Sequence, residues 1–255
     1  MIVACSQPNL TKAFLYGVMR GAAGDVPPQM KPFDLGIFPY HPEGEVTTSE
    51  EADLFLSDER IGAGPIFFPY WHWKVPVGLV KTGRCIGFHP TDLPYGRGGS
   101  PIQNLILEGR RNTYLSCYQM TDEMDAGPVF RKSWLNLDGS ASDIYDRLAW
   151  EAGVIAQWLW GEWTTEQKLQ LPESTPQRAA TASDPVFVRR KPEQSALDTG
   201  LKQEKIHDFI RMLDAPWLPH AFVQTGDYKI ELTNARFDLG RTGELRADAR
   251  FRRAD

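Results

Sequence analysis

Residues 65–92 read PIFFPYWHWKVPVGLVKTGRCIGFHPTD and carry the clearest fold signal in the chain. Two short apolar runs, 66–68 and 85–88, have the length and composition of strands buried in a parallel sheet. Aromatic or polar side chains follow each run, at 70–73 and at 89–92. Because ligands bind beyond the carboxyl ends of strands in open α/β sheets, we expect both of these segments to face a site.

The chain on either side continues the same α/β pattern. A strand is predicted at 2–5, with an amphipathic helix after it. A helix capped by a Ser-Pro pair is predicted over about 101–108. Strands are predicted at 114–119 and 129–135. A second helix is predicted to start at a capping box formed by residues 140–143. No G-x-G-x-x-G follows the first strand, so a dinucleotide cofactor is disfavoured. The fold class is therefore α/β with a mostly parallel sheet.

A change in composition marks the end of this domain. Residues 164–184 are polar and rich in Thr, Gln and Pro, which is typical of a linker. An apolar helical stripe at 206–213 and a hairpin pattern around 225–227 predict a small α+β appendage beyond it. The predicted organisation is a first domain at 1–163, a linker at 164–184 and a C-terminal subdomain at 185–255.

The bulk composition favours small-molecule chemistry. The formal charge of −5 gives no basic field for nucleic acid. No leader and no long apolar span is recognised, so a cytoplasmic protein without a membrane segment is expected. Cys5, Cys85 and Cys117 lie far apart without C-x-x-C spacing, so neither a disulfide nor a zinc site is predicted.

Two motifs in register resemble the signature of the folate-dependent formyltransferases. Residues 86–106 read IGFHPTDLPYGRGGSPIQNLI and residues 120–129 read MTDEMDAGPV. The family carries N-x-H-x-S-L-L-P, a Gly-rich turn and helix, and an acidic D-x-x-x-D-x-G loop. His89 aligns with its catalytic His and Asp125 with its catalytic Asp, at the family's usual interval of 36 residues. The resemblance implies a Rossmann-like formyltransferase domain that uses N10-formyltetrahydrofolate and no metal.

The same alignment suggests roles for further residues. Thr91 aligns with the Ser of the motif, and Gly87 stands where the family has an Asn that helps to polarise the formyl oxygen. Thr91, Asn104 or a backbone N–H are the candidates to replace that Asn, and the choice among them stays open. By resemblance, the candidate folate-binding residues, acting largely through their main chain, are Trp71, His72, Trp73, Lys74, Val75, Asp122, Glu123 and Met124. Candidate substrate contacts are Tyr95 and Arg97.

An imidazole with a carboxylate suits this chemistry on physical grounds as well. Formyl transfer requires a proton to leave the attacking amine and another to reach the departing folate nitrogen. Histidine titrates near neutrality and can do both, and a carboxylate beside it would orient the ring. Asp125 can play that part only if the acidic loop folds over the end of the strand that carries His89.

Each of these residues also has a structural interpretation. His89 can be a satisfied core histidine, and Asp125 can be a turn residue that binds backbone N–H groups. The aromatic run 70–73 can simply pack the core. The Gly-rich turn at 96–99 can be a tight connection, and Arg97 is more readily a surface ion pair than a phosphate ligand.

The acceptor is predicted from the C-terminal part. Segments 189–195 and 209–222 resemble sugar-nucleotide N-formyltransferases, so a nucleotide-linked amino sugar is the preferred acceptor. Methionyl-tRNA is the alternative within the family, but residues 185–255 carry only 13 Lys and Arg against 11 Asp and Glu, a weak field for tRNA. Other small amines, a catalytically silent relative, a hydrolase and a homodimer are left open.

Overall fold

The computed structural model describes residues 2–5, 10, 13–14, 16–18, 36–38, 64–71, 73–164, 170–237 and 244–253. The chain forms two compact units, each assembled from separate stretches of sequence. The first unit comprises Met1–Arg97, Tyr114–Leu135 and Asp146–Val186. The second unit comprises Gly98–Thr113, Asn136–Tyr145 and Phe187–Asp255. The units follow tertiary contacts and not sequence order, and the split into 1–163, 164–184 and 185–255 stays a prediction.

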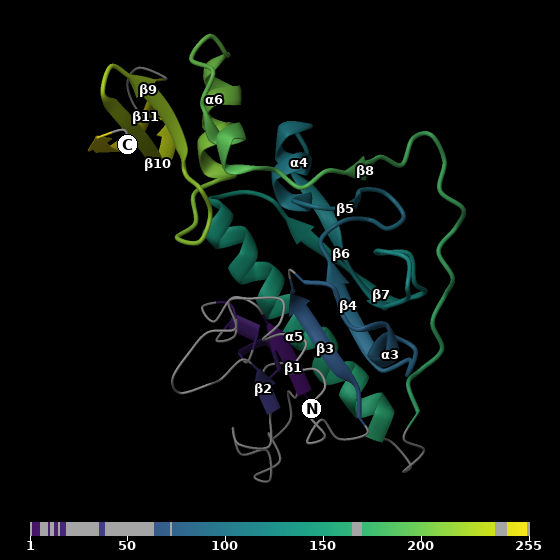
Figure 1. Ribbon diagram of the computed structural model, residues 1–255. Coiled ribbons are helices and arrows are strands. Elements are labelled where there is room, and N and C mark those ends of the chain that lie inside the picture. Colours follow the sequence, from purple (N-terminus) through teal and green to yellow (C-terminus); the bar gives the residue numbers. More distant parts are fainter. Residues whose placement is uncertain are drawn as a thin grey trace. The chain divides into compact units, whose positions relative to one another are not determined.

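The first unit is built on a six-stranded sheet with the order β2-β1-β3-β4-β6-β7 (Figure 1). The strands are β1 Ile2–Cys5, β2 Gly36–Phe38, β3 Ile66–Tyr70, β4 Cys85–His89, β6 Asn112–Gln119 and β7 Val129–Asn136. β2, β1, β3 and β4 pair in parallel, whereas β4 and β6 pair antiparallel. The predicted α/β class is confirmed, and the sheet is mixed because β6 returns beside β4.

Helices complete the architecture. Figure 1 shows α5 running along one face of the sheet, behind β1 and β3. The helical elements are α3 Val77–Val80, α4 Pro101–Leu107, α5 Ala141–Thr164, the 3-10 turn η3 Pro192–Ser195 and α6 Gln203–Arg211. β5 Arg97–Gly98 and β8 Val186–Phe187 form a separate two-stranded ladder. α5 ends at Thr164, the first residue of the segment predicted as a linker.

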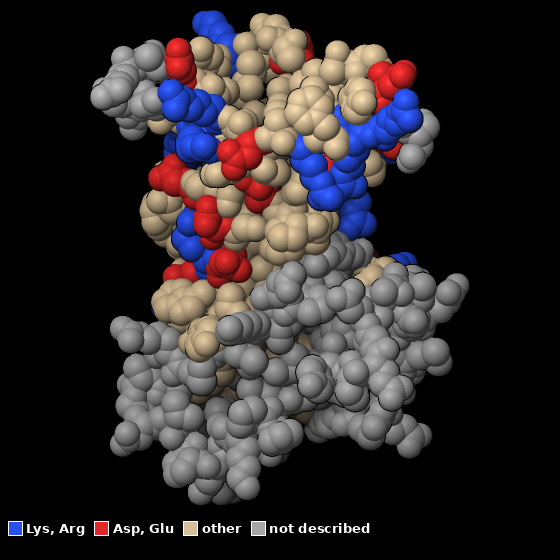
Figure 2. Space-filling view, turned by 90° about the vertical axis from the view of Figure 1, so that its left-hand side faces the viewer, with Lys and Arg blue, Asp and Glu red and all other residues tan. Residues whose placement is uncertain are grey.

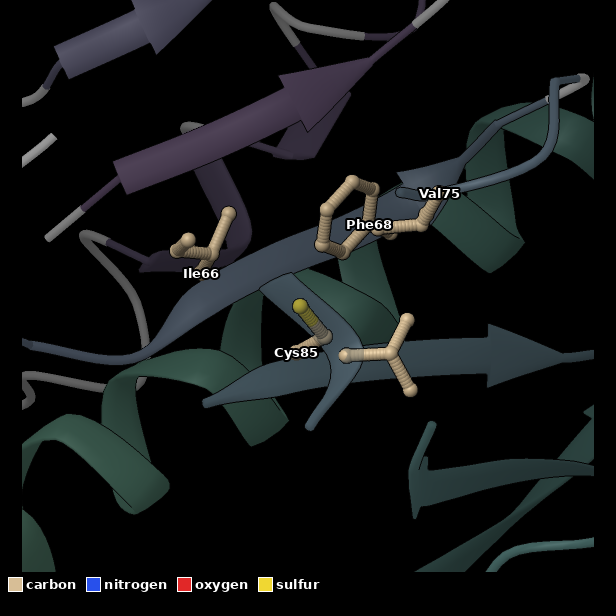
Figure 3. Packing of buried hydrophobic residues seen from close by; sticks show 5 residues of the cluster. Ile66, Phe68, Val75 and Cys85 are labelled. Carbon is tan, nitrogen blue, oxygen red and sulfur yellow. The ribbon is translucent and has the colours of Figure 1, made fainter. Parts of the chain in front are cut away.

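The apolar runs at 66–68 and 85–88 lie in the core, as predicted. Buried residues from β3, β4 and the connection between them pack into one cluster, shown in Figure 3: Ile66, Phe68, Val75, Val80 and Cys85. Trp71, Leu79 and Met120 pack against its edge. The Cys85 and Cys117 side chains are buried, and burial raises the pKa of the Cys85 thiol to about 12, so this thiol is held neutral.

Two glycines bring α5 against the helical residues near the start of the chain. A Cβ added to Gly153 would lie 2.1 Å from the Phe14 carbonyl oxygen, and one added to Gly17 would lie 1.9 Å from the Trp150 carbonyl oxygen. Real Cβ atoms do not approach backbone atoms so closely. Both positions therefore require glycine for backbone-to-backbone packing.

We expect Gly153→Ala to lower the free energy of unfolding by about 3 kcal/mol, because the obstructing atoms belong to backbone and cannot move aside. Gly161→Ala in the same helix is the matched control. No described atom lies within 4 Å of a Cβ at Gly161, so only helix propensity acts and stability should hold or rise by up to about 1 kcal/mol. Denaturant unfolding measures both variants, and equal stability would contradict the close packing.

The second unit contains α4, α6 and a three-stranded sheet with the order β11-β10-β9. Its strands are β9 Ala221–Thr225, β10 Tyr228–Phe237 and β11 Leu245–Arg253, and both pairings are antiparallel. The predicted hairpin is confirmed as β9 and β10. The Arg-rich residues 246–253 lie in β11, and most of their side chains are exposed.

Two predicted helix caps have different outcomes. At the start of α5, the Asp143 N–H donates to Ser140 Oγ at 3.2 Å and the Ser140 N–H donates to Asp143 Oδ2 at 2.8 Å, so the capping box is confirmed. At the start of α4, Pro101 occupies the first turn, but Ser100 does not cap the helix with its side chain. Ser100 adopts a φ of 49°, and its hydroxyl accepts the Arg190 N–H at 3.0 Å.

Candidate active site

His89 ends β4, at the carboxyl edge of the parallel strands. Its ring is buried and lies between two oxygen atoms of the first unit. Nδ1 is 3.5 Å from Asp125 Oδ2, and Nε2 is 2.8 Å from the Gly96 carbonyl oxygen. The acidic loop therefore folds over the end of the His89 strand, which is the geometric condition set by the sequence analysis.

Both neighbours of the His89 ring are hydrogen-bond acceptors. The Gly96 carbonyl can only accept, so the short contact requires a hydrogen on Nε2. A second hydrogen on Nδ1 would face the Asp125 carboxylate. The protonated ring can donate a hydrogen bond to both neighbours, whereas the neutral ring can donate to only one. This arrangement suits a group that accepts and releases a proton.

The Asp125 carboxylate is fixed by its backbone and by a second side chain. Asp125 adopts a φ of 54°, in the left-handed region that Asp tolerates better than most residues. Its Oδ1 accepts a hydrogen bond of 2.7 Å from the Tyr118 hydroxyl, while Oδ2 faces His89. Asp125 thus joins Tyr118 and His89 in one short network on the first unit.

Tyr118 is a site residue that the sequence analysis missed. It lies on β6 directly opposite Gly87 of β4. A Cβ added to Gly87 would lie 2.6 Å from Tyr118 Cζ and 2.8 Å from its hydroxyl oxygen, so the ring occupies the space that a side chain at 87 would need. The available signal was a glycine inside a central strand, which often marks a close approach by another group.

The two side chains considered as replacements for the missing Asn are placed differently. Thr91 is fully buried, and within the described part of the chain its hydroxyl has no hydrogen-bond partner. Asn104, in the second unit, donates from Nδ2 to the carbonyl oxygens of Gly99 at 3.0 Å and Val188 at 3.4 Å. The Asn104 amide hydrogens are thus engaged by the unit's own backbone, while the Thr91 hydroxyl is not.

The predicted linker contributes a residue that holds the site. Gln177 donates from Nε2 to the carbonyl oxygens of Asp125 and Gly127, each at 2.8 Å. Its Oε1 accepts hydrogen bonds from Arg97 at 3.2 and 2.8 Å. Thr175 also exchanges two backbone hydrogen bonds of 2.8 Å with Val129. Residues 175–177 are therefore a strap that holds the acidic loop, although the composition around them is typical of a linker.

Arg97 and the Gly-rich turn around it make structural contacts. The Arg97 guanidinium contacts Glu123 at 3.1 Å in addition to Gln177. A Cβ at Gly98 would lie 2.2 Å from the Phe187 carbonyl oxygen, so this glycine admits the backbone of the same unit. These contacts favour the structural interpretation of Arg97 over a substrate contact. Tyr95, the other candidate substrate contact, is half-buried.

The aromatic segment after β3 belongs partly to the core. The Val75 side chain is buried in the cluster of Figure 3, so a contact of Val75 with a ligand would have to use its main chain. Trp71 stacks edge-on against Phe68 at 5.5 Å and Trp73 at 5.1 Å, and its buried indole N–H has no partner among the described residues. Lys74 is exposed. His72 lies outside the described residues.

The acidic loop presents its side chains to solvent. Asp122 is exposed, and the Glu123 and Met124 side chains are 76% and 66% exposed. The main chain is ordered by the Thr121 hydroxyl, which donates to the Glu123 carbonyl oxygen at 3.1 Å. Gly127 admits the Gln119 carbonyl oxygen, which would lie 1.7 Å from a Cβ at that position. The loop is thus held by its backbone, and its side chains remain outside.

A cavity of about 340 Å³ lies elsewhere on the first unit, at the amino ends of β3 and β4. Its lining includes Pro65, Arg84, Gln119 and Trp163, and none of the candidate site residues. Among the described residues, no cluster of three or more His, Cys, Asp or Glu side chains could hold a metal ion. Within the same residues, no helix has the length and apolar character needed to cross a membrane.

Comparison with known proteins agrees with this fold. The C-terminal domain of methionyl-tRNA formyltransferase matches residues 192–252. Methionyl-tRNA formyltransferase from Clostridium thermocellum is 30% identical and superimposes with a TM-score of 0.74, covering 99% of this chain and 98% of its own. Its counterpart from Staphylococcus epidermidis is 26% identical over 215 residues, which are 80% of this chain and 63% of that protein.

A third relative shares the fold at low identity. The N-formyltransferase of Helicobacter canadensis, in complex with folinic acid and dTDP-3-aminofucose, is 14% identical with a TM-score of 0.56, covering 93% of this chain and 88% of that one. The fold and the His–Asp pair define a Rossmann-like protein with a polar site at the strand ends. The chain belongs to the formyltransferase family that includes the methionyl-tRNA formyltransferases. It spans about 63% of the length of the S. epidermidis relative.

Proposed function

We propose that the chain transfers a formyl group from N10-formyltetrahydrofolate to a primary amine. The observation that carries this proposal is the contact between His89 and Asp125, in a chain that belongs to the formyltransferase family. His89 moves the protons and Asp125 holds the ring. His89 is buried and Asp125 is partly buried at the edge where ligands of α/β sheets bind.

The proposed reaction balances with one proton-transfer group. The amine nitrogen attacks the formyl carbon, a new C–N bond forms, and the carbonyl oxygen becomes an oxyanion. Collapse of this intermediate breaks the bond between the formyl carbon and N10, whose electron pair takes a proton. His89 accepts the proton of the attacking amine and returns one to N10, while the Asp125 carboxylate stabilises the charged imidazole in between.

We further propose that the folate contacts the segment 71–75 and the loop 121–125. In the described residues of both segments the side chains are core, exposed or paired with neighbours, which leaves main-chain groups as the recognition surface. The H. canadensis relative binds folinic acid, a reduced folate, and shares this fold. A reduced folate as the formyl donor is therefore the consistent assignment.

The preferred acceptor changes from the one expected from sequence. The segments 189–195 and 209–222 overlap the region that matches the C-terminal domain of methionyl-tRNA formyltransferase. The amino-sugar acceptor is therefore not favoured, and we propose methionyl-tRNA as the acceptor to test first. A nucleotide-linked amino sugar stays as a second candidate because the charge of residues 185–255 is weak. On the face seen in Figure 2, Lys and Arg side chains occur together with Asp and Glu side chains.

One assay tests the donor and both acceptors. The protein is incubated with N10-formyltetrahydrofolate and either methionyl-tRNA or a set of nucleotide-linked amino sugars, and tetrahydrofolate release and formylated amine are both measured. We expect equal amounts of the two products, with methionyl-tRNA the better acceptor. Tetrahydrofolate release without formylated amine would identify a hydrolase, and no release with any acceptor would support a silent relative.

The strap gives a further prediction. Gln177→Ala removes the hydrogen bonds that tie the acidic loop to Arg97, so we expect the free energy of unfolding to fall by about 2 kcal/mol and kcat/KM by roughly tenfold. Gln224→Ala, which removes an exposed glutamine in the β9–β10 hairpin, is the control and should change neither quantity. Unchanged kinetics in Gln177→Ala would show that the strap does not position Asp125.

A further inference from the structure

The Tyr118 ring and Gly87 form a matched pair across β4 and β6. Directly paired residues of an antiparallel ladder project to the same face of the sheet, and His89, two residues after Gly87, shares that face. Because Gly87 has no side chain, the Tyr118 ring lies across β4 with its hydroxyl oxygen 2.8 Å from the position of the missing Cβ. Any larger residue at 87 would exclude the ring from this position.

The Tyr118 side chain is buried, and its hydroxyl donates a hydrogen bond of 2.7 Å to Asp125 Oδ1. Burial, followed by the charge of Asp125 and the hydrogen bond to it, raises the pKa of Tyr118 well above its usual value, so the phenol keeps its hydrogen. The neighbouring Cys117 thiol also stays neutral, because burial raises its pKa well above the ordinary value. Tyr118 is thus joined to Asp125 and, through Asp125, to His89.

We propose that Tyr118 is a positioning residue of the active site: it fills the volume left by the missing side chain at Gly87 and fixes the Asp125 carboxylate, through which it orients His89. This inference rests on the proposed function and extends it to a residue outside the family motif. A carboxylate with one oxygen held by a phenol has its other oxygen directed at the His89 ring. The absence of a side chain at Gly87 thus makes room for the Tyr118 ring, and the two residues depend on each other.

The test uses Tyr118→Phe, which keeps the ring over Gly87 and removes only the hydroxyl. Without that donor, one oxygen of the Asp125 carboxylate is no longer held, so the other is directed less firmly at the His89 ring. The ring NMR signals of His89, assigned by their loss in His89→Asn, should therefore shift at fixed pH. kcat should fall roughly tenfold, while the KM for the folate should hold.

Tyr145→Phe is the matched control, since it removes another buried phenol hydroxyl whose described partner is the Gln103 amide. It should leave the His89 ring signals and kcat unchanged. A folded Tyr118→Phe protein with wild-type His89 signals and wild-type kcat would overturn the positioning role. If the wild type transfers no formyl group, the proposed function fails, while the His89 signals still decide whether Tyr118 positions the His89–Asp125 pair.

Discussion

Replacing His89 with Asn is expected to lower turnover about a thousandfold, because an amide of similar shape cannot accept and return a proton. The side chain at 89 is buried between Asp125 and Gly96, so an Asn can keep part of the packing and leave the backbone of β4 in place. Binding of a stable folate analogue should be retained. Calorimetry for the analogue and a tetrahydrofolate-release assay for turnover measure the two quantities separately.

The companion variants separate proton transfer from general damage. Asp125→Asn should also lower turnover. It removes the negative charge that stabilises the imidazolium, and its amide oxygen accepts a weaker hydrogen bond from Tyr118 than the carboxylate does. His220→Asn is the control for an imidazole outside the network, and its turnover should match that of the wild type. Wild-type turnover in His89→Asn would remove His89 from the mechanism, whatever the effect on folding.

Local and periodic signals predicted a large part of this fold. The apolar runs at 66–68 and 85–88 predicted buried parallel strands. A continuous apolar run is typical of a strand that is buried on both faces, and these residues are buried. The Ser140–Asp143 box predicted a helix start because all of its atoms lie within four residues. The pairing of His89 with Asp125 was predicted from two motifs whose spacing matches a family, and the structure brings the two side chains together.

Long-range partners could not be predicted in the same way. Tyr118 lies in an ordinary alternating strand, and its importance depends on the register that sets it opposite Gly87. Gln177 is 52 residues from Asp125 along the chain, inside a segment whose composition is that of a linker. The burial of the Val75 side chain likewise depends on packing between β3, β4 and the segment that connects them. In each case the deciding contact comes from tertiary packing, which composition and periodicity do not record.

Gly87→Asn would restore the side chain that the family carries, and we expect it to damage this protein. The new Cβ would lie 2.6 Å from Tyr118 Cζ, so the buried ring would have to shift. The free energy of unfolding should fall by about 3 kcal/mol, and turnover about a hundredfold, because the displaced ring no longer holds Asp125. Gly78→Asn, at a position with open space around its Cβ in the described structure, is the control.

The decisive comparison is the double variant Gly87→Asn with Tyr118→Ala. Removing the ring opens the volume that the Asn requires, so the two changes should cost less together than the sum of their separate effects, by at least about 1 kcal/mol in the free energy of unfolding. Part of the turnover lost in Gly87→Asn should also return, since an amide can then occupy the space next to His89. Strictly additive losses would show that Gly87 and Tyr118 are not a matched pair. A gain in turnover from Gly87→Asn alone would show instead that the wild-type site lacks an oxyanion donor that the Asn supplies.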